Sequence, residues 1–438
     1  MKMRAPATES PEEAIVSVSS TPVRSDYARM RVVKSQSDLL SRLQCFLPGA
    51  SGVEGLEIGG CETPRCVGEF WTSKQRQAAS ISEISYRACF KPQLPRFFIE
   101  LLTQKNDTVY DPFSGRGTTV IEAGLLGRSI IANDANPLSA ILARPRFAPP
   151  DLARLETRLA ALPFSNEFET EIDLSMFFHP QTLVEIISIR NYLEEKRKTG
   201  HDDDIDRWIR MVASNRLTGH STGFFSVYTL PPNQAVSPES QIKINQRLRQ
   251  EPEYRDTKRI ILKKTQSLLR NLTDAQRRNL WIAGDSGKFL TQDAADTREI
   301  ASGSVQLTVT SPPFLDVVQY SNDNWLRCWF NNLDAKTISK QITVLRNIDD
   351  WRAKMGDVFK ELFRVTKSGG WVAFEVGEVR NGKINLDEYV VPLGVGAGFG
   401  CAGILINQQK FTKTANIWGV KNNKSGTNTN RIVLFRKS

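Results

Sequence analysis

The sequence has few of the side chains that bind metals or form disulfides. Its 438 residues include only six cysteines and three histidines. No two cysteines stand in a C-x-x-C pair and the histidines are far from them in sequence, so neither a zinc site nor a disulfide framework is expected. No apolar run approaches the roughly 20 residues needed to cross a bilayer, and no secretory signal pattern is present. These absences predict a cytoplasmic protein that contacts no membrane and holds no metal.

Acidic residues are outnumbered by basic ones. The chain carries 58 Lys or Arg against 48 Asp or Glu, a formal net charge of +10, and 40% of its residues are hydrophobic. The apolar content permits a sizeable core, and the basic excess suits a polyanionic partner. Ribosomal, membrane-surface and merely soluble basic proteins share that excess, so charge alone does not choose between them.

A glycine turn between two short apolar strands organises the sequence. Residues 108–111 read as a strand that ends in Asp111, and residues 114–117, SGRG, form a tight turn. A helix is predicted from about residue 120 to 126, ended by Gly127, and a second strand over 129–132 is closed by Asp134. An acid at the end of the second strand after a glycine turn is where nucleotide-binding folds hold ribose hydroxyls. The turn is therefore predicted to bind a nucleoside.

The turn lacks the third glycine of the phosphate-binding fingerprint. Val120 occupies that position, and Asp111 stands immediately before the turn. A carboxylate there would repel a pyrophosphate but attract a cationic amino group. S-adenosylmethionine, which carries an ammonium, a sulfonium and no phosphate, fits this pattern.

A second stretch, residues 305–314 (VQLTVTSPPF), indicates the chemistry. The apolar strand stops at Pro312 and Pro313, which fix the backbone and donate no hydrogen bonds. Ser311 and the Pro312 carbonyl could accept both N–H groups of an exocyclic amine, and Phe314 offers a face for a base to stack on. Taken alone, the stretch could also be an ordinary strand-ending turn.

Two of these segments resemble the amino-methyltransferases that modify exocyclic amines of DNA bases. Residues 111–119, DPFSGRGTT, resemble their motif I, and TSPPF resembles motif IV in the serine form associated with cytosine N4. Residues 86–95 resemble motif X, which lies beside the methionine end of the cofactor. The resemblance implies a cofactor site formed by the following residues: Phe90, Lys91, Pro92, Asp111, Pro112, Phe113, Gly115, Gly117, Thr118, Thr119 and Asp134. It also implies that residues 279–285, NLWIAGD, are the strand whose terminal Asp285, with Ser286, meets the adenine amino group.

Strands alternating with helices predict an α/β fold, a doubly wound, Rossmann-like class I methyltransferase sheet with an antiparallel final hairpin. The predicted organisation is an N-terminal tail and variable region over 1–68, the first half of the sheet over 69–150 and the second half over 279–438. Between them, 151–278 is too long for a connection and reads as a mainly helical insertion.

The insertion is the predicted target-recognition domain. Residues 207–270 hold twelve Lys or Arg against four Asp or Glu. The polar residues flanking the aromatic loop at 219–234 are the candidates for base contacts, and the basic residues on the following helices are the candidates for phosphate contacts. The first set is Asn215, Arg216, His220, Asn233 and Gln234, and the second is Lys243, Arg247, Lys258 and Lys263. The alternative is that the loop packs on the core and its polar groups satisfy the backbone.

The leading hypothesis is a site-specific methyltransferase acting on cytosine N4 in double-stranded DNA, with a cognate restriction endonuclease as an expected partner. The alternatives are adenine N6 in DNA and guanine N2 in tRNA, whose enzymes share a DPFxGxGT turn and a Pro-Pro motif. A nucleic-acid-binding module on an inactive methyltransferase fold is the non-enzyme alternative.

Overall fold

A computed structural model gives the arrangement of the chain. It describes residues 53–58, 61–68, 70, 78–86, 89–165, 170, 172–229, 235–315, 320–342, 345, 347–380, 383–408 and 429–438. The predicted loose tail over 1–26 lies outside these residues, as do Asn233 and Gln234.

Within the described residues, nine strands form one mixed sheet in the order β1-β2-β10-β11-β7-β6-β3-β4-β5. Strands β5, β4, β3, β6 and β7 run parallel, and β11 is antiparallel to both β7 and β10. The strands are β1 (Val53–Ile58), β2 (Cys61–Gly68), β3 (Thr108–Asp111), β4 (Ser129–Asn133), β5 (Lys288–Leu290), β6 (Val305–Thr310), β7 (Thr366–Val376), β10 (Gly400–Gln408) and β11 (Thr429–Arg436). A separate small hairpin joins β8 (Glu378–Val379) to β9 (Ile384–Asn385). Parallel strands followed by an antiparallel final pair confirm the predicted Rossmann-like methyltransferase fold.

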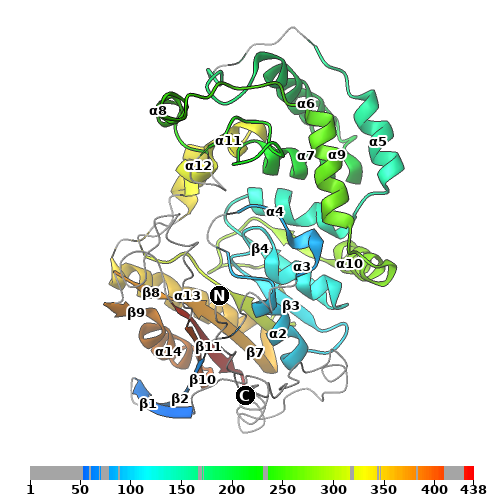
Figure 1. Cartoon of the computed structure of the whole chain (residues 1–438). Helices are drawn as coiled ribbons and strands as arrows, with labels where there is room; N and C mark the ends of the chain where they lie inside the picture. Colours follow the sequence, from blue (N-terminus) through cyan, green and yellow to red (C-terminus); the bar gives the residue numbers. More distant parts are fainter. Residues whose placement is uncertain are drawn as a thin grey trace, which may run out of the picture.

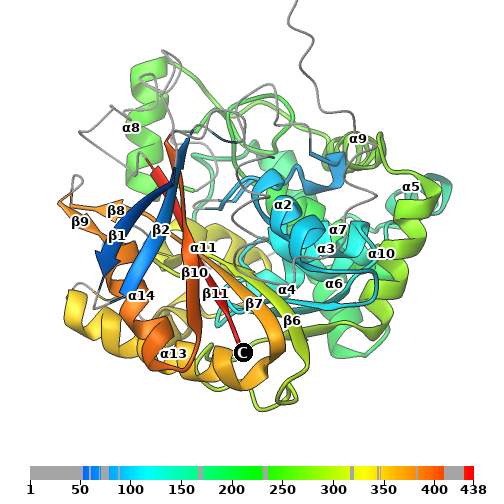
Figure 2. The ribbon, with the colours of Figure 1, turned by 90° about the horizontal axis from the view of Figure 1, so that it is seen from below.

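Helices cover both faces of the sheet, because its central strands are apolar along their whole length. All six residues of β6 are buried. One face packs against α2 (Gln93–Leu102), α3 (Thr118–Leu125) and α10 (Asp274–Ser286), and the other against α13 (Ile348–Val365) and α14 (Leu386–Gly396) (Figure 2). This two-sided burial is typical of parallel sheets.

The insertion forms a helical layer across from the carboxyl ends of the central strands (Figure 1). Its helices are α5 (Leu152–Ala161), α6 (Pro180–Lys198), α7 (Asp204–Arg216), α8 (Pro238–Leu248) and α9 (Thr257–Leu269). Short elements on the sheet side complete the fold: η3 (Ser80–Ser82), α4 (Leu138–Ala143) and η4 (Arg144–Phe147). No helix among the described residues is long and apolar enough to span a membrane.

A second segment, which comes later in the sequence, also belongs to this helical layer. Helices α11 (Tyr320–Phe330) and α12 (Ala335–Gln341) follow β6 but lie with the insertion (Figure 1). The Trp325 indole donates to the carbonyls of Ala235 and Val236 at 3.2 Å, and Arg190 donates to Trp329 O at 3.0 Å. The helical layer is therefore built from two separate stretches of sequence.

Candidate functional site

The site lies where the strand order reverses. The chain leaves β3 for β4 and β5 on one side and returns through β6 and β7 on the other, so the carboxyl ends of β3 and β6 border a crevice. Most of the predicted catalytic and cofactor residues follow these strands. The structure thus brings together two segments that are about 200 positions apart in sequence.

The turn after β3 requires glycine at two positions. Gly115 has φ +52° and Gly117 has φ +80°, a left-handed conformation that other residues adopt at a cost. A Cβ on Gly117 would lie 2.7 Å from the Ala143 Cβ. The buried Arg146 holds the turn in place by donating to the carbonyls of Arg116 and, at 3.1 Å, Leu142. These backbone angles and contacts leave little room for any other residue at Gly117.

Replacing Gly117 with alanine should therefore destabilise the fold. Positive φ alone costs about 1–2 kcal/mol, and the clash with Ala143 adds a packing penalty of about 1–3 kcal/mol. The matched control is Gly303→Ala, where φ is +64° but nothing lies within 4 Å of the new Cβ. Thermal unfolding should give a clearly lower Tm for Gly117→Ala than for the control, and equal Tm values would contradict the packing argument.

Asp111 is the last residue of β3, directly before the pocket-lining Pro112 and Phe113, and has 2% of its surface exposed. Its Oδ1 accepts from Thr310 Oγ1 at 2.7 Å and from the Phe113 N–H at 3.2 Å. Burial raises the pKa of Asp111 to about 7, although the hydrogen bonds from Thr310 and the Phe113 N–H lower it. A cation placed beside this carboxylate would favour its ionised form, which matches the predicted role.

Asp134 follows β4 and accepts two backbone hydrogen bonds. Its Oδ2 receives the Gly115 N–H and its Oδ1 the Asn136 N–H, both at 2.8 Å. Burial raises its pKa to about 6, against the effect of these two bonds. Asp134 also lines an apolar pocket with Phe113 and Met355. A carboxylate at the rim of an apolar slot suits a nucleoside, whose base is flat and whose sugar carries hydroxyls.

The predicted strand at 279–285 is wrong. These residues belong to helix α10, which begins with a capping box between Thr273 and Gln276. Asp285 and Ser286 are exposed on this helix and do not line the pocket. The apolar residues that suggested a strand, Trp281 and Ile282, are each 59% exposed. The predicted adenine contact at Asp285 therefore has no structural basis.

The third parallel strand is β5, and the carboxylate that follows it is Asp293. Asp293 lines the same pocket as Asp134 and bonds to Lys354. Burial raises the pKa of Asp293, but the hydrogen bonds from Lys354 and the Ala295 N–H together lower it by more. The pKa of Asp293 therefore lies below its ordinary value. The strand has only three residues, too few for a periodicity signal, which is why sequence reasoning missed it.

The segment after β6 is fixed by two contacts. Ser311 hydrogen-bonds to Glu375, a residue of β7 with 4% of its surface exposed. Asn430 on β11 also donates to Glu375, and the Trp351 indole donates to Pro313 O at 3.0 Å. Burial raises the pKa of Glu375, while its bonds to Ser311 and Asn430 lower it. Sequence reasoning missed Glu375, although an acid within the apolar run WVAFEV was the available signal.

Pro312 is buried, and Phe314 is half-buried against the apolar core between the sheet and α13. The remaining cofactor candidates lie on the other side of the turn. Pro92 caps α2, and Phe90 packs against the core on that face. The Cys89 thiol donates to the Tyr86 carbonyl at 3.5 Å, and the Tyr86 ring lies against Gly115, so the segment that continues to Lys91 starts beside the turn.

The candidates for base contact divide into two groups. Asn215 is 2% exposed, and its side-chain amide forms two hydrogen bonds with the backbone of Ser85. It accepts from the Ser85 N–H at 3.1 Å and donates to the Ser85 carbonyl at 2.7 Å. Arg216 is buried against the Phe224 ring. His220 is exposed. In this conformation Asn215 links two segments and cannot meet a base edge, which agrees with the alternative of a packed loop.

The candidates for phosphate contact are also not equivalent. Lys243 and Arg247 are exposed on α8, and Lys263 is exposed on α9. Lys258 donates to Leu162 O at 3.0 Å and lies 4.2 Å from the Phe164 ring. It therefore tethers α9 to the end of α5.

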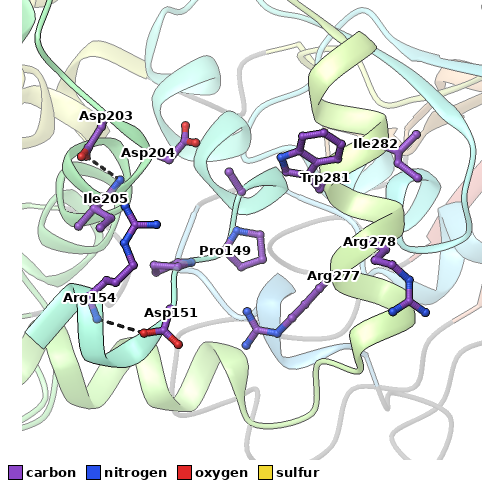
Figure 3. A pocket seen from close by; sticks show the side chains of 12 residues that line it. Pro149, Asp151, Arg154, Asp203, Asp204, Ile205, Arg277, Arg278, Trp281 and Ile282 are labelled. Carbon is purple, nitrogen blue, oxygen red and sulfur yellow. Dashed lines mark hydrogen bonds between the residues drawn. The ribbon is translucent and has the colours of Figure 1, made fainter.

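A cavity of about 570 Å³ lies away from this crevice, between α5, the start of α7 and α10 (Figure 3). Arg154, Ile205, Arg277 and Trp281 are among the residues that line it. None of the residues at the carboxyl edge of the sheet reaches it. It is not part of the candidate site.

The fold is a Rossmann-like α/β sheet, and the candidate site lies at its switch point. A family model described as DNA methylase, N6_N4_Mtase, matches residues 7–140. The Type II methyltransferase M.MvaI of Kocuria varians is 25% identical over 171 residues, which are 34% of this chain and 37% of that protein. The Type II methyltransferase M.MjaII of Methanocaldococcus jannaschii is 30% identical over 71 residues, 16% of this chain and 13% of that protein. The rRNA methyltransferase AviRa of Streptomyces viridochromogenes aligns in structure with a TM-score of 0.34 and 14% identity, covering 84% of this chain and 94% of that one.

These sequence matches support a relationship to the S-adenosylmethionine-dependent DNA amino-methyltransferases, and the family model covers residues 7–140 of the 438. The chain spans little more than a third of the first relative and less of the second.

Proposed function

We propose that this protein methylates an exocyclic amine of a DNA base, with cytosine N4 preferred to adenine N6. The observation that carries the proposal is Ser311 at the switch point, bonded to the buried Glu375 and two positions before Pro313, which lines the pocket of Asp134. The serine form of the segment favours cytosine. The family matches support DNA as the substrate.

The residues of the crevice fit S-adenosylmethionine. Asp134 can accept ribose hydroxyls, Asp293 can accept from the adenine amino group, and Asp111 can pair with the ammonium. When bound, the cofactor supplies an electrophilic methyl group on a sulfonium. The pocket encloses about 70 Å³, far less than the usual 300–1,000 Å³ of a ligand site, so the pocket must widen when the cofactor enters.

Ser311 and Glu375 would act on the target amine together. With Glu375 ionised, the Ser311 hydroxyl donates to it and turns an oxygen lone pair toward an N–H of the amine. The Pro312 carbonyl accepts the other N–H, and the nitrogen lone pair is left for the methyl group. After transfer, the amine loses one proton, which can pass through the Ser311 hydroxyl to Glu375. The raised pKa of Glu375 makes it a suitable acceptor.

The target base must leave the duplex to reach this site. Base flipping costs a few kcal/mol, which stacking on Phe314 and the amine hydrogen bonds would offset. The helical layer opposite the carboxyl edge is the proposed target-recognition region. We extend it from residues 151–278 to include 320–342, because α11 packs on the insertion rather than on the sheet.

Cofactor affinity should depend on pH. Asp111 and Asp134 have pKa values raised to about 7 and about 6. In the free protein each carboxylate is therefore protonated below its pKa, whereas the proposed cofactor contacts need the ionised form. Affinity should therefore fall as pH drops from 8 to 5.5, by about tenfold per unit between the pKa values of Asp111 and Asp134 and more steeply below that of Asp134. Calorimetry across this range would measure it. An Asp111→Asn variant should lose the upper part of the dependence, and a flat wild-type profile would contradict the assignment.

Product analysis tests the proposed function most directly. The protein is incubated with labelled S-adenosylmethionine and either duplex DNA or tRNA, and the nucleic acid is digested to nucleosides for mass detection. N4-methylcytosine is the expected product. N6-methyladenine would show that the target base is adenine, and N2-methylguanine in tRNA would show that the substrate is RNA. Binding of nucleic acid without any methylated product would favour the inactive module. A cognate restriction endonuclease is a further expectation of the proposal, tested by protection of the methylated DNA from cleavage.

A further inference from the structure

A basic groove of about 480 Å³ lies on the helical layer, at the start of α9. We call this the α9 groove. Its cationic residues come from the end of α7 and from α9 with the segment before it: Arg216, Arg255, Arg259, Lys263 and Lys264. The single acid of its lining, Asp256, caps α9 by accepting the Arg259 N–H at 2.9 Å. The groove therefore carries a strong excess of positive charge.

Two of these cations are available to a ligand. Arg259 and Lys263 are exposed, and neither side chain forms an ion pair or hydrogen bond with any residue in the described ranges. They are four positions apart on one helix, about 6 Å along its axis, so both face the groove. The Nε of Arg255 is buried there and has no hydrogen-bond partner within the described part of the chain. Unpaired donors around a hollow indicate an anionic ligand.

The inner wall holds two further cations close together. Lys264 donates to the Glu83 carbonyl at 2.7 Å, and burial together with the charge of Arg216 lowers its pKa to about 8. Arg216 lies 3.9 Å from the centre of the Phe224 ring. An anion in the groove would relieve the repulsion between these two cations.

The α9 groove is separated from the cofactor turn by a single segment, residues 83–86. Lys264 contacts this segment at Glu83, and Asn215, next to Arg216, holds Ser85. The ring of Tyr86 lies against Gly115 of the turn, 3.6 Å from where a Cβ would be. A polyanion in the groove is thus held beside the methyl-transfer site.

We propose that the α9 groove binds the sugar–phosphate backbone of duplex DNA next to the target base. The proposal rests on the proposed function and names how the substrate is held. Arg259 and Lys263 would contact neighbouring phosphates of one strand, because phosphates accept any cation and need no base edge. This places the backbone on α9, and it leaves the exposed cations of α8 outside the groove.

The test is a double substitution, Arg259→Gln with Lys263→Gln, in the full chain. Its matched control is Arg277→Gln with Arg278→Gln, which removes two charges from α10 on the cavity of Figure 3. Binding of a duplex should weaken about tenfold or more at low salt in the groove variant, equally for different sequences, and the slope of log K against log salt should fall by about two. Cofactor affinity should stay unchanged in both variants, which shows that both are folded.

Three results would overturn the α9 groove as the DNA site, and the first two are an unchanged duplex affinity and salt slope, or an equal loss in the control pair. A loss confined to structured RNA, with duplex affinity kept, would assign the groove to a different polymer and also overturn it. Failure of the proposed function is a separate outcome, since it shows as absent methylated product with wild-type protein. Fluorescence anisotropy measures duplex affinity without methyl transfer, so it tests the groove independently of that result.

Discussion

Replacing Ser311 with alanine is expected to lower kcat about 100-fold or more while the Kd of the cofactor stays the same. In the proposed mechanism the hydroxyl contacts the target amine and not the cofactor, and the loss of a positioned proton-transfer group typically costs 10²–10⁴ in rate. Single-turnover kinetics with methylatable DNA, paired with calorimetry for the cofactor, would separate the two effects. Ser311→Thr keeps a hydroxyl and should recover part of the rate.

Glu375→Gln tests the same arrangement from its buried side. The amide keeps the shape of the carboxylate and can still bond to Asn430, but it cannot take a proton from Ser311. We expect a loss of kcat comparable to that of Ser311→Ala, and a double variant no worse than either single one, because the two side chains act as a unit. Full activity in Ser311→Ala, or additive losses in the double variant, would refute this mechanism.

Replacing Asp134 with alanine is expected to weaken cofactor binding by about 10- to 100-fold. Hydrogen bonds to a charged group contribute about 1.5–3 kcal/mol, and Asp134 lies at the rim of the nucleoside pocket while also holding the N–H of Gly115. Asp285→Ala is the matched control, since it removes an exposed carboxylate of α10. Calorimetry should show unchanged affinity in the control, and unchanged affinity in Asp134→Ala would remove that residue from the site.

The ends of strands could be predicted from the sequence wherever glycines or prolines follow them directly. The helix predicted from about residue 120 to 126 corresponds to α3, and the strand predicted over 305–310 is β6. Prolines and glycines act locally, so their effect survives whatever the neighbours are. Asp111, Asp134 and Ser311 directly follow such signals, and all three lie at the predicted edge of the sheet.

The error at 279–285 has a physical cause. An apolar run closed by an acid resembles a buried strand, but here the run contains Trp281 and Ile282, which are largely exposed on a helix. The capping box at Thr273 was the local evidence for a helix. Burial depends on what packs against a segment, and a short run of residues does not carry that information.

The sequence by itself determined the glycine turn, the carboxylates that close β3 and β4, and the proline stop after β6, because each depends on backbone conformation within a few residues. Only the tertiary structure decided which groups meet across long separations. Glu375 lies under Ser311 because β7 is the neighbour of β6, and Asp293 joins Asp134 because β5 is the neighbour of β4. The α9 groove likewise joins the end of α7 to α9. Strand pairing and helix packing are set by the burial of whole faces, so these partners follow from the fold and not from any motif.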